Sequence, residues 1–300
     1  MTLTSVLSKL RDLNIEIRYL DGKLKINAPE GSLTPELTAE LQRHKEELIV
    51  FFMDIAADDK AYEEIKPIAI EEDYALSHAQ RRLWVLDQLQ VGKISYNLSW
   101  LCRIDKNLNP EILGRVLQSL VARHESLRTV FVEVEGEPRQ KILSVEESGF
   151  ELDYKDLRAD PRAIDRAKQI AQREAETPFD LSTGPLLRAK LLQVDTEGYY
   201  LLLTVHHIIV DGWSMELLSN EIHILYRSYV SGEAVLLPPL RIQYKDYTYW
   251  QERQLSGERL KGHRQYWMDQ LSGELPVLEL PTDYPRPSLP SLRGKTLEFT

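Results

Sequence analysis

The 300-residue sequence has a single cysteine, no long apolar run and no basic cluster, and each absence excludes a class of protein. One cysteine, Cys102, leaves no intrachain disulfide and is typical of a reducing compartment. No run reaches the ~20 apolar residues of a membrane-spanning helix, and the N-terminus lacks a signal-peptide pattern. With 37 Lys and Arg against 47 Asp and Glu, a net charge of -10 does not favour nucleic-acid binding. We therefore expect a soluble, cytoplasmic protein that uses neither membranes nor nucleic acids.

The sequence otherwise has the composition of a globular protein, with 43% hydrophobic and 28% charged residues. Three hundred residues exceed the commonest domain size and favour one small and one large unit. Cys102 lies in an apolar run and is expected to be a small buried residue rather than a nucleophile. The predicted segments are a small unit over 1–53, an acidic linker over 54–73, a large domain over 74–280 and a proline-rich connection over 281–300.

The sequence of the small unit predicts a helix, a hairpin and a second helix. Residues 4–14 have helical apolar spacing, Asp21-Gly22 predicts a hairpin turn, and Thr34-Pro35 predicts the start of a second helix. A two-stranded hairpin leaves a free edge that can accept an extended peptide, although such a unit can equally pack on the large domain or dimerise. The hairpin residues expected to carry a docking contact are Ile15, Ile17, Tyr19, Leu24 and Ile26.

In the large domain, strands and helices alternate irregularly, which predicts a mixed α/β fold with an at least partly antiparallel sheet. The strands over 186–194 and 199–207 are separated by Asp195–Gly198 and should pair antiparallel. An amphipathic helix is expected from about Ser214 to Val230, with Ser214 as its N-cap.

The stretch from Leu201 to Ser214 is the one that points most directly to chemistry. Side chains alternate along a strand, so His206 and His207 should leave the backbone on opposite faces, one toward a cleft and one toward the core. That split argues against joint zinc ligation, and we predict no metal site. Asp211 follows the strand, where its carboxylate can turn back, and Gly212 permits the turn. Two interpretations remain open. Either both histidines are buried core residues, or one imidazole accepts and donates a proton during a reaction.

Four separate stretches in this order resemble the motifs of the condensation domains of nonribosomal peptide synthetases. These stretches are Ser77–Trp84, Arg123–Phe131, His206–Ser214 and Tyr244–Trp250. The resemblance implies a lobe with the fold of chloramphenicol acetyltransferase, a mixed and largely antiparallel sheet with helices. Such domains have two of these lobes, so the chain is expected to be incomplete as a catalyst.

The resemblance also implies roles for single residues. His207 would be the catalytic histidine and His206 a structural one. Asp211 would pair with an arginine, for which Arg128 is a candidate, and Gly212 would leave room for the pantetheine arm. Trp213 and Ser214 complete the supporting motif. The reaction implied is amide formation between thioesters carried on the 4'-phosphopantetheine of donor and acceptor carrier proteins, with no cofactor bound directly by this chain.

The first fifty-odd residues resemble the small N-terminal docking domain, of TubC type, found on some synthetase subunits. Such an α-β-β-α module receives a C-terminal linear motif of the preceding subunit, and homodimerisation through it is a second expectation. The rival functions are an epimerisation domain, a coenzyme A acyltransferase and a non-catalytic docking or scaffold module. Trp213-Ser214 and the stretch from Arg123 favour condensation. A heterocyclisation domain would carry aspartate in place of the histidine pair.

Overall fold

The computed structural model describes residues 6, 9–10, 13, 15–20, 23–29, 32–51, 64–89, 94–105, 108–233 and 237–285. The chain divides into two compact units after Glu64, within the predicted linker. Each unit is described by itself. None of the described helices is both long enough and apolar enough to cross a membrane.

The small unit contains the predicted hairpin. Strands β1 (Glu16–Leu20) and β2 (Lys23–Asn27) pair antiparallel, with Ile17 opposite Ile26, while the Asp21-Gly22 turn itself lies outside the described residues. Helix α2 (Pro35–Arg43) begins as predicted, because the Thr34 hydroxyl accepts a hydrogen bond from the Leu37 amide at 3.2 Å. Of the first helix, predicted over 4–14, residues 6, 9 and 10 are described and helical, residue 13 is described as a turn, and the others lie outside the described residues. The core of the unit is formed by Val6, Leu10, Ile15, Leu37, Leu41 and Leu48.

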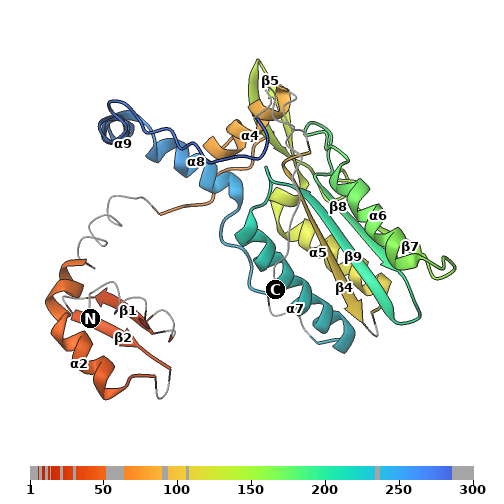
Figure 1. Cartoon of the computed structure of the whole chain (residues 1–300), viewed down its shortest axis with the longest axis horizontal. Helices are drawn as coiled ribbons and strands as arrows, with labels where there is room; N and C mark the ends of the chain where they lie inside the picture. Colours follow the sequence, from red (N-terminus) through yellow and green to blue (C-terminus); the bar gives the residue numbers. More distant parts are fainter. Residues whose placement is uncertain are drawn as a thin grey trace. The chain divides into compact units, whose positions relative to one another are not determined.

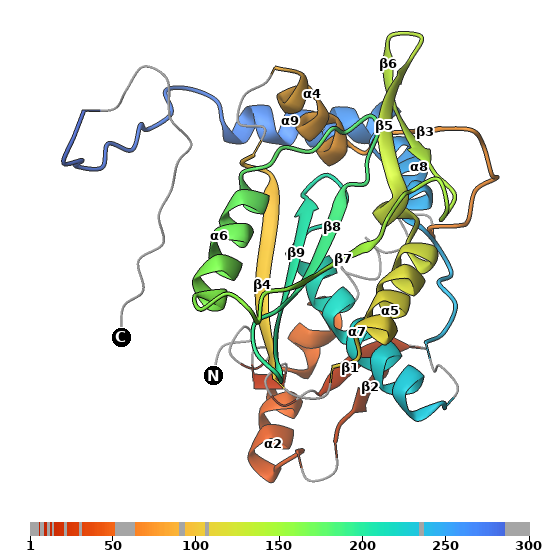
Figure 2. The ribbon, with the colours of Figure 1, turned by 90° about the vertical axis from the view of Figure 1, so that its right-hand side faces the viewer.

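The large unit is a mixed α/β structure whose central sheet lies between helices (Figure 1, Figure 2). Its elements in chain order are β3 (Tyr74–Ala75), α4 (His78–Gln88), β4 (Asn97–Asp105), α5 (Pro110–Arg123), a 3-10 turn (Glu125–Arg128), β5 (Thr129–Val134), β6 (Glu137–Ile142), β7 (Leu152–Asp156), α6 (Ala163–Ala175), β8 (Leu187–Gln193), β9 (Gly198–His206), α7 (Gly212–Ser231), α8 (Tyr244–Gln254) and α9 (Gly257–Gln270). Of the proline-rich connection predicted over 281–300, residues 281–285 are described and the others lie outside the described residues.

The central sheet has the strand order β4-β9-β8-β7. Strand β9 is antiparallel to both β4 and β8, as the Asp195–Gly198 turn predicts, and β7 adds to β8 in parallel. A second sheet has the order β3-β6-β5. The predicted mixed, largely antiparallel fold is therefore confirmed.

Helices α5 and α7 lie on one side of the central sheet and α6 on the other (Figure 2). The Asn109 side chain caps α5 by accepting from two amides, and Pro110 opens the helix, as its sequence predicts. The apolar stripe of α5 is buried against the sheet, since Leu113, Val116 and Leu120 are each at most 3% exposed. Helix α5 also packs against α7, the helix that follows β9.

Two predictions about local structure were wrong. Cys102 on β4 is exposed rather than buried, although it shares a strand face with Leu98 and Trp100, which pack against the core. Strand β4 is at the end of the sheet order, where a side chain is less completely covered. Helix α7 begins at Gly212, and its N-cap is Asp211 instead of Ser214. The Asp211 side chain accepts from the Ser214 amide, so the carboxylate at the earlier position takes the capping role that a serine hydroxyl would otherwise fill.

Candidate active site

The two histidines at the end of β9 lie in different surroundings. Strand β9 ends at His206, and the His207 amide continues the ladder by donating to Tyr96 O at 2.8 Å. His206 is 2% exposed, whereas His207 is half-buried. The split that strand alternation predicts is therefore present in the structure, although His207 is the first residue beyond the strand.

His206 is packed as a core residue. Its ring lies 6.1 Å from that of Phe179 and 6.3 Å from that of Tyr96, measured between centroids. Its Nδ1 accepts a hydrogen bond from the Ile208 amide at 3.2 Å, so this nitrogen is unprotonated. Burial lowers the pKa of His206 to about 4, and the neighbouring His207 acts in the same direction. His206 is thus a neutral, structural imidazole at physiological pH.

One ring nitrogen of His207 is held by a backbone carbonyl. Its Nδ1 lies 2.7 Å from Val210 O, and a carbonyl oxygen can only accept, so Nδ1 carries the proton of this hydrogen bond. In the neutral ring, Nε2 is then the unprotonated nitrogen and can accept a proton or a hydrogen bond. The turn over 207–210 therefore fixes both the orientation and the tautomer of the imidazole.

The next residues of the motif form the start of α7. The Asp211 carboxylate accepts from the Ser214 amide at 2.8 Å and from the Ser214 hydroxyl at 2.6 Å. These two hydrogen bonds lower the pKa of Asp211. A Cβ built on Gly212 meets no atom within 4 Å, so the surface above this residue is open. The neighbouring Trp213 is 82% exposed on the same turn.

Arg128, the predicted partner of Asp211, does not meet it. Its Nη1 donates to Leu143 O, between the 3-10 turn and the end of β6. No ion pair joins Arg128 and Asp211 in the part of the chain that the structure describes. The carboxylate of Asp211 is instead satisfied by Ser214, as an N-cap needs.

The other motifs that the sequence singles out meet each other through polar contacts. Arg123 Nε and His124 Nε2 lie 3.1 Å and 2.6 Å from the carboxylate of Glu221 on α7. The Ser77 hydroxyl lies 2.9 Å from that of Tyr244, which ties α4 to α8. Glu125 pairs with Lys245 at 2.9 Å. These contacts join the end of α5 to α7, and join both α4 and the 3-10 turn to α8.

Glu221 is the residue of this network that sequence reasoning missed. It is 4% exposed and lies between the buried Leu218 and Leu225 on the inner stripe of α7. A carboxylate at an apolar position of an amphipathic helix needs a buried partner. That pattern, together with the Arg123-His124 pair elsewhere in the chain, is the signal that could have found it.

The predicted docking residues of the small unit divide into two groups. Ile15 is buried in its core, and Ile17 and Leu24 pack against that core. Ile26 is 42% exposed on β2. The side chain of Tyr19 lies outside the described residues.

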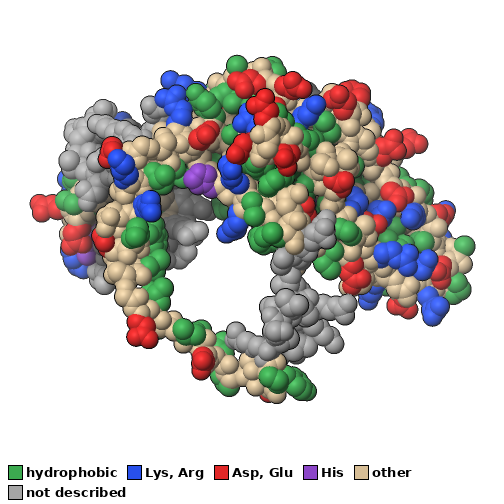
Figure 3. Space-filling view, turned by 90° about the horizontal axis from the view of Figure 1, so that it is seen from above, with side chains coloured by type: hydrophobic (Ala, Val, Ile, Leu, Met, Phe, Trp, Pro, Cys, Tyr) green, Lys and Arg blue, Asp and Glu red, His purple; other side chains and the backbone are tan. Residues whose placement is uncertain are grey.

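Surface charge, metal ligands and cavities are the other features of the molecule that could mark a site. Acidic and basic side chains are interspersed on the face shown in Figure 3. Among the described residues, no group of three or more His, Cys, Asp or Glu is placed to hold a metal ion. Cavities of about 1030 Å³ and 520 Å³ in the large unit are lined by residues outside 206–214.

Comparison with known families matches nearly the whole chain. Residues 70–300 match the family described as Condensation domain, and residues 4–54 match the TubC N-terminal docking domain. The chain is 39% identical over 261 residues to malpinin synthetase of Mortierella alpina, covering 87% of this chain and 3% of that protein. It is 34% identical over 295 residues to bacitracin synthase 2 of Bacillus licheniformis, covering 98% of this chain and 11% of that protein. The chain therefore spans a small part of the length of these relatives.

Solved structures with the same fold are condensation domains. The first condensation domain of the calcium-dependent antibiotic synthetase is 25% identical with a TM-score of 0.61, covering 67% of this chain and 48% of that one. The starter condensation domain of rhizomide synthetase is 21% identical with a TM-score of 0.62, covering 67% and 48% of the two chains. The predicted chloramphenicol-acetyltransferase-like fold is confirmed by these matches.

Proposed function

We infer the function from the family to which this chain belongs, the condensation domains of nonribosomal peptide synthetases, here with a TubC N-terminal docking domain. We propose that the protein forms an amide bond between two thioesters, each tethered to the phosphopantetheine arm of a carrier protein. The single observation that carries this proposal is the contact of His207 Nδ1 with Val210 O at 2.7 Å, which leaves Nε2 as the ring nitrogen that can accept a proton.

In the proposed reaction, the α-amine of the acceptor attacks the thioester carbonyl of the donor. The new bond joins nitrogen to the carbonyl carbon, the carbon–sulfur bond breaks, and the proton lost by nitrogen ends on the departing thiolate. An α-amine has a pKa of about 8, so a useful fraction is neutral near pH 7. His207 Nε2 therefore needs only to orient the amine and accept its proton as the bond forms.

The surrounding residues support this assignment by their positions. His206 is sealed in the core, which leaves His207 as the imidazole of the pair that a substrate can reach. Gly212 leaves open space at the start of α7, where a pantetheine arm can pass. Asp211 acts on the helix start instead of on the substrate, because Ser214 occupies its acceptor oxygen.

The β1–β2 hairpin of the small unit is where we expect a partner protein to bind. The strands β1 and β2 form a two-stranded sheet, so each has an outer edge that can pair with an extended chain. Ile15, Ile17 and Leu24 hold the hairpin on the core of the small unit, and Ile26 is exposed beside the edge of β2. We propose that the C-terminal linear motif of an upstream subunit adds here.

The experiment that tests the proposed function is product formation by a His207→Ala variant in the complete condensation domain. With a donor and an acceptor loaded on carrier proteins, mass spectrometry of the tethered product should show a loss of ~10²–10⁴-fold. The variant should keep the melting temperature of the parent, since His207 is half-buried. Turnover at the parental rate would remove His207 from the mechanism.

The same experiment separates the rival functions. An epimerisation domain would exchange the α-proton of a tethered aminoacyl group for deuterium without forming a dipeptide. A scaffold module would bind the upstream subunit and show neither reaction. Dipeptide formation that depends on His207 is the result that the condensation proposal requires.

A further inference from the structure

Strand β7 is an outer strand of the central sheet, with β8 as its neighbour on one side. The Leu157 amide donates to Gln193 O at 2.8 Å, which fixes the odd-numbered residues of this segment as those that bond to β8. The amide and carbonyl of Leu152 and of Tyr154 therefore point to the opposite, outer edge. No turn or loop of the described chain supplies a backbone hydrogen bond to these four groups.

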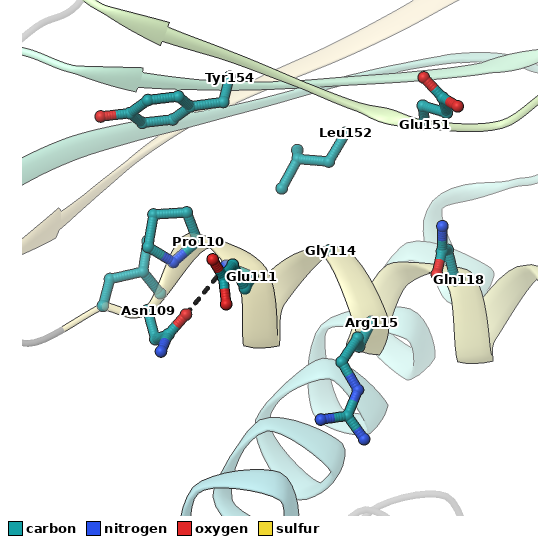
Figure 4. Close-up of a pocket in the computed structure, with 10 residues that line it drawn as sticks. Asn109, Pro110, Glu111, Gly114, Arg115, Gln118, Glu151, Leu152 and Tyr154 are labelled. Carbon is teal, nitrogen blue, oxygen red and sulfur yellow. Dashed lines mark hydrogen bonds between the residues drawn. The ribbon is translucent and has the colours of Figure 1, made fainter.

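A groove lies beside this edge. It has a volume of about 1030 Å³ and is lined by β7 and α5. Figure 4 shows Leu152 pointing from β7 toward α5, where Gly114 presents no side chain. A Cβ built on Gly114 comes only to 4.0 Å from Leu152 Cδ2. A methyl group at position 114 would therefore just touch Leu152, so any larger side chain there would extend into the groove.

The groove carries a net negative charge. Glu111 and Glu151 are exposed among its lining residues. Arg115 also lines it, but the guanidinium lies 4.9 Å from the centre of the Tyr229 ring, and Figure 4 shows it pointing away from β7. An occupant with Lys or Arg side chains would therefore be favoured over an acidic one.

We propose that β7 is a docking edge for an extended, basic peptide segment of a partner protein. The segment adds as a fifth strand, bonded to the amides and carbonyls of Leu152 and Tyr154. Its side chains alternate in direction, so every second one, a Lys or Arg, faces α5 and reaches Glu111 and Glu151 in the groove. This site is distinct from the His207 motif and does not depend on the proposed reaction.

The test measures binding of a fluorescent hexapeptide of alternating lysine and valine to the whole chain by fluorescence anisotropy. Tyr154→Pro removes the outward amide and keeps the backbone hydrogen bonds to β8, a change that edge strands tolerate. It also removes the hydrogen bond from the Tyr154 hydroxyl to Gln193 Oε1 on β8. The matched control Tyr154→Thr removes the same ring and keeps the amide. We expect saturable binding that Tyr154→Pro weakens at least about tenfold and Tyr154→Thr leaves within about threefold, since one backbone hydrogen bond and its desolvation are at stake.

Two further measurements keep the proposal falsifiable if Tyr154→Pro lowers stability. Gly114→Leu places a side chain in the groove, so it should abolish binding. Because leucine has a higher helix propensity than glycine, this variant should remain folded. A glutamate–valine hexapeptide should bind at least about tenfold more weakly than the lysine–valine one. Absence of saturable binding, or binding unaffected by Tyr154→Pro and Gly114→Leu, would contradict the proposal. Self-association of the chain that Tyr154→Pro abolishes would assign the edge to a second copy and overturn the peptide as its occupant.

Discussion

His206 and His207 are adjacent in the sequence, yet the end of β9 and the turn after it place them in opposite surroundings. The first is buried beside the rings of Tyr96 and Phe179, and the second is half-buried with Nδ1 held by Val210 O. The last residue of the strand points into the core, and the turn over 207–210 directs the next side chain away from it. One peptide bond thus separates a residue whose chemistry is suppressed from one whose chemistry is available.

The same contrast extends along α7. In the middle of the helix, Glu221 is buried against Arg123 and His124, whereas the first turn carries the exposed Gly212 and Trp213. The buried part is held by packing and charged hydrogen bonds, and the exposed part by one capping carboxylate. The first turn of α7 can therefore remain exposed to a substrate, because the buried middle of the helix holds it in place. The following predictions change one side of this contrast at a time.

The largest expected change in stability comes from the buried histidine. His206→Ala removes a ring at 2% exposure and leaves the Ile208 amide without its acceptor. We expect a loss of about 3 kcal/mol in the free energy of unfolding, measured by urea denaturation. His206→Asn, which can return an acceptor oxygen near the position of Nδ1, should cost less. If His206→Ala and His207→Ala were equally destabilising, the division of the pair into a structural and a reactive residue would be wrong.

Acidification should lower the free energy of unfolding through the same buried residue, His206. The pKa of His206 is lowered to about 4 by burial, while the unfolded chain binds this proton near the ordinary value of 6.5. The unfolded state therefore takes up the proton first, and stability is lost as the pH falls from about 6.5 toward 4. Between pH 8 and pH 5 this linkage amounts to about 2 kcal/mol. The measurement is the difference in urea stability between the parent and His206→Asn at the two pH values, and a difference that does not change with pH would contradict it.

Much of this architecture could be predicted from the sequence, and the exceptions share a physical cause. The β8–β9 pair, the apolar stripe of α5 and the split of the histidines follow from periodicity and turn residues, which act locally. The Glu221 network and the contact of Arg128 with Leu143 depend on which elements meet, and sequence spacing does not encode that. Asp211 shows a third case, in which two good N-cap residues, Asp211 and Ser214, stand within one turn. The structure selects the carboxylate, because it can accept from both the amide and the hydroxyl of Ser214.

The smallest expected effect belongs to the exposed side, at Asp211. Asp211→Ala removes the N-cap of α7, and we expect a loss of about 1 kcal/mol in urea stability. Asp211→Asn keeps an acceptor oxygen and should lose only part of this. The pKa of Asp211 is lowered by the hydrogen bonds from Ser214, so its contribution is present above the unfolded pKa and disappears as the pH falls through the folded one. A loss of about 3 kcal/mol or more, equal in the alanine and asparagine variants, would indicate a buried ion pair at Asp211 and not a helix cap. The start of α7 would then be held by buried charged contacts, as the middle of the helix is at Glu221, and a helix cap would not explain how the turn at Gly212 is stabilised.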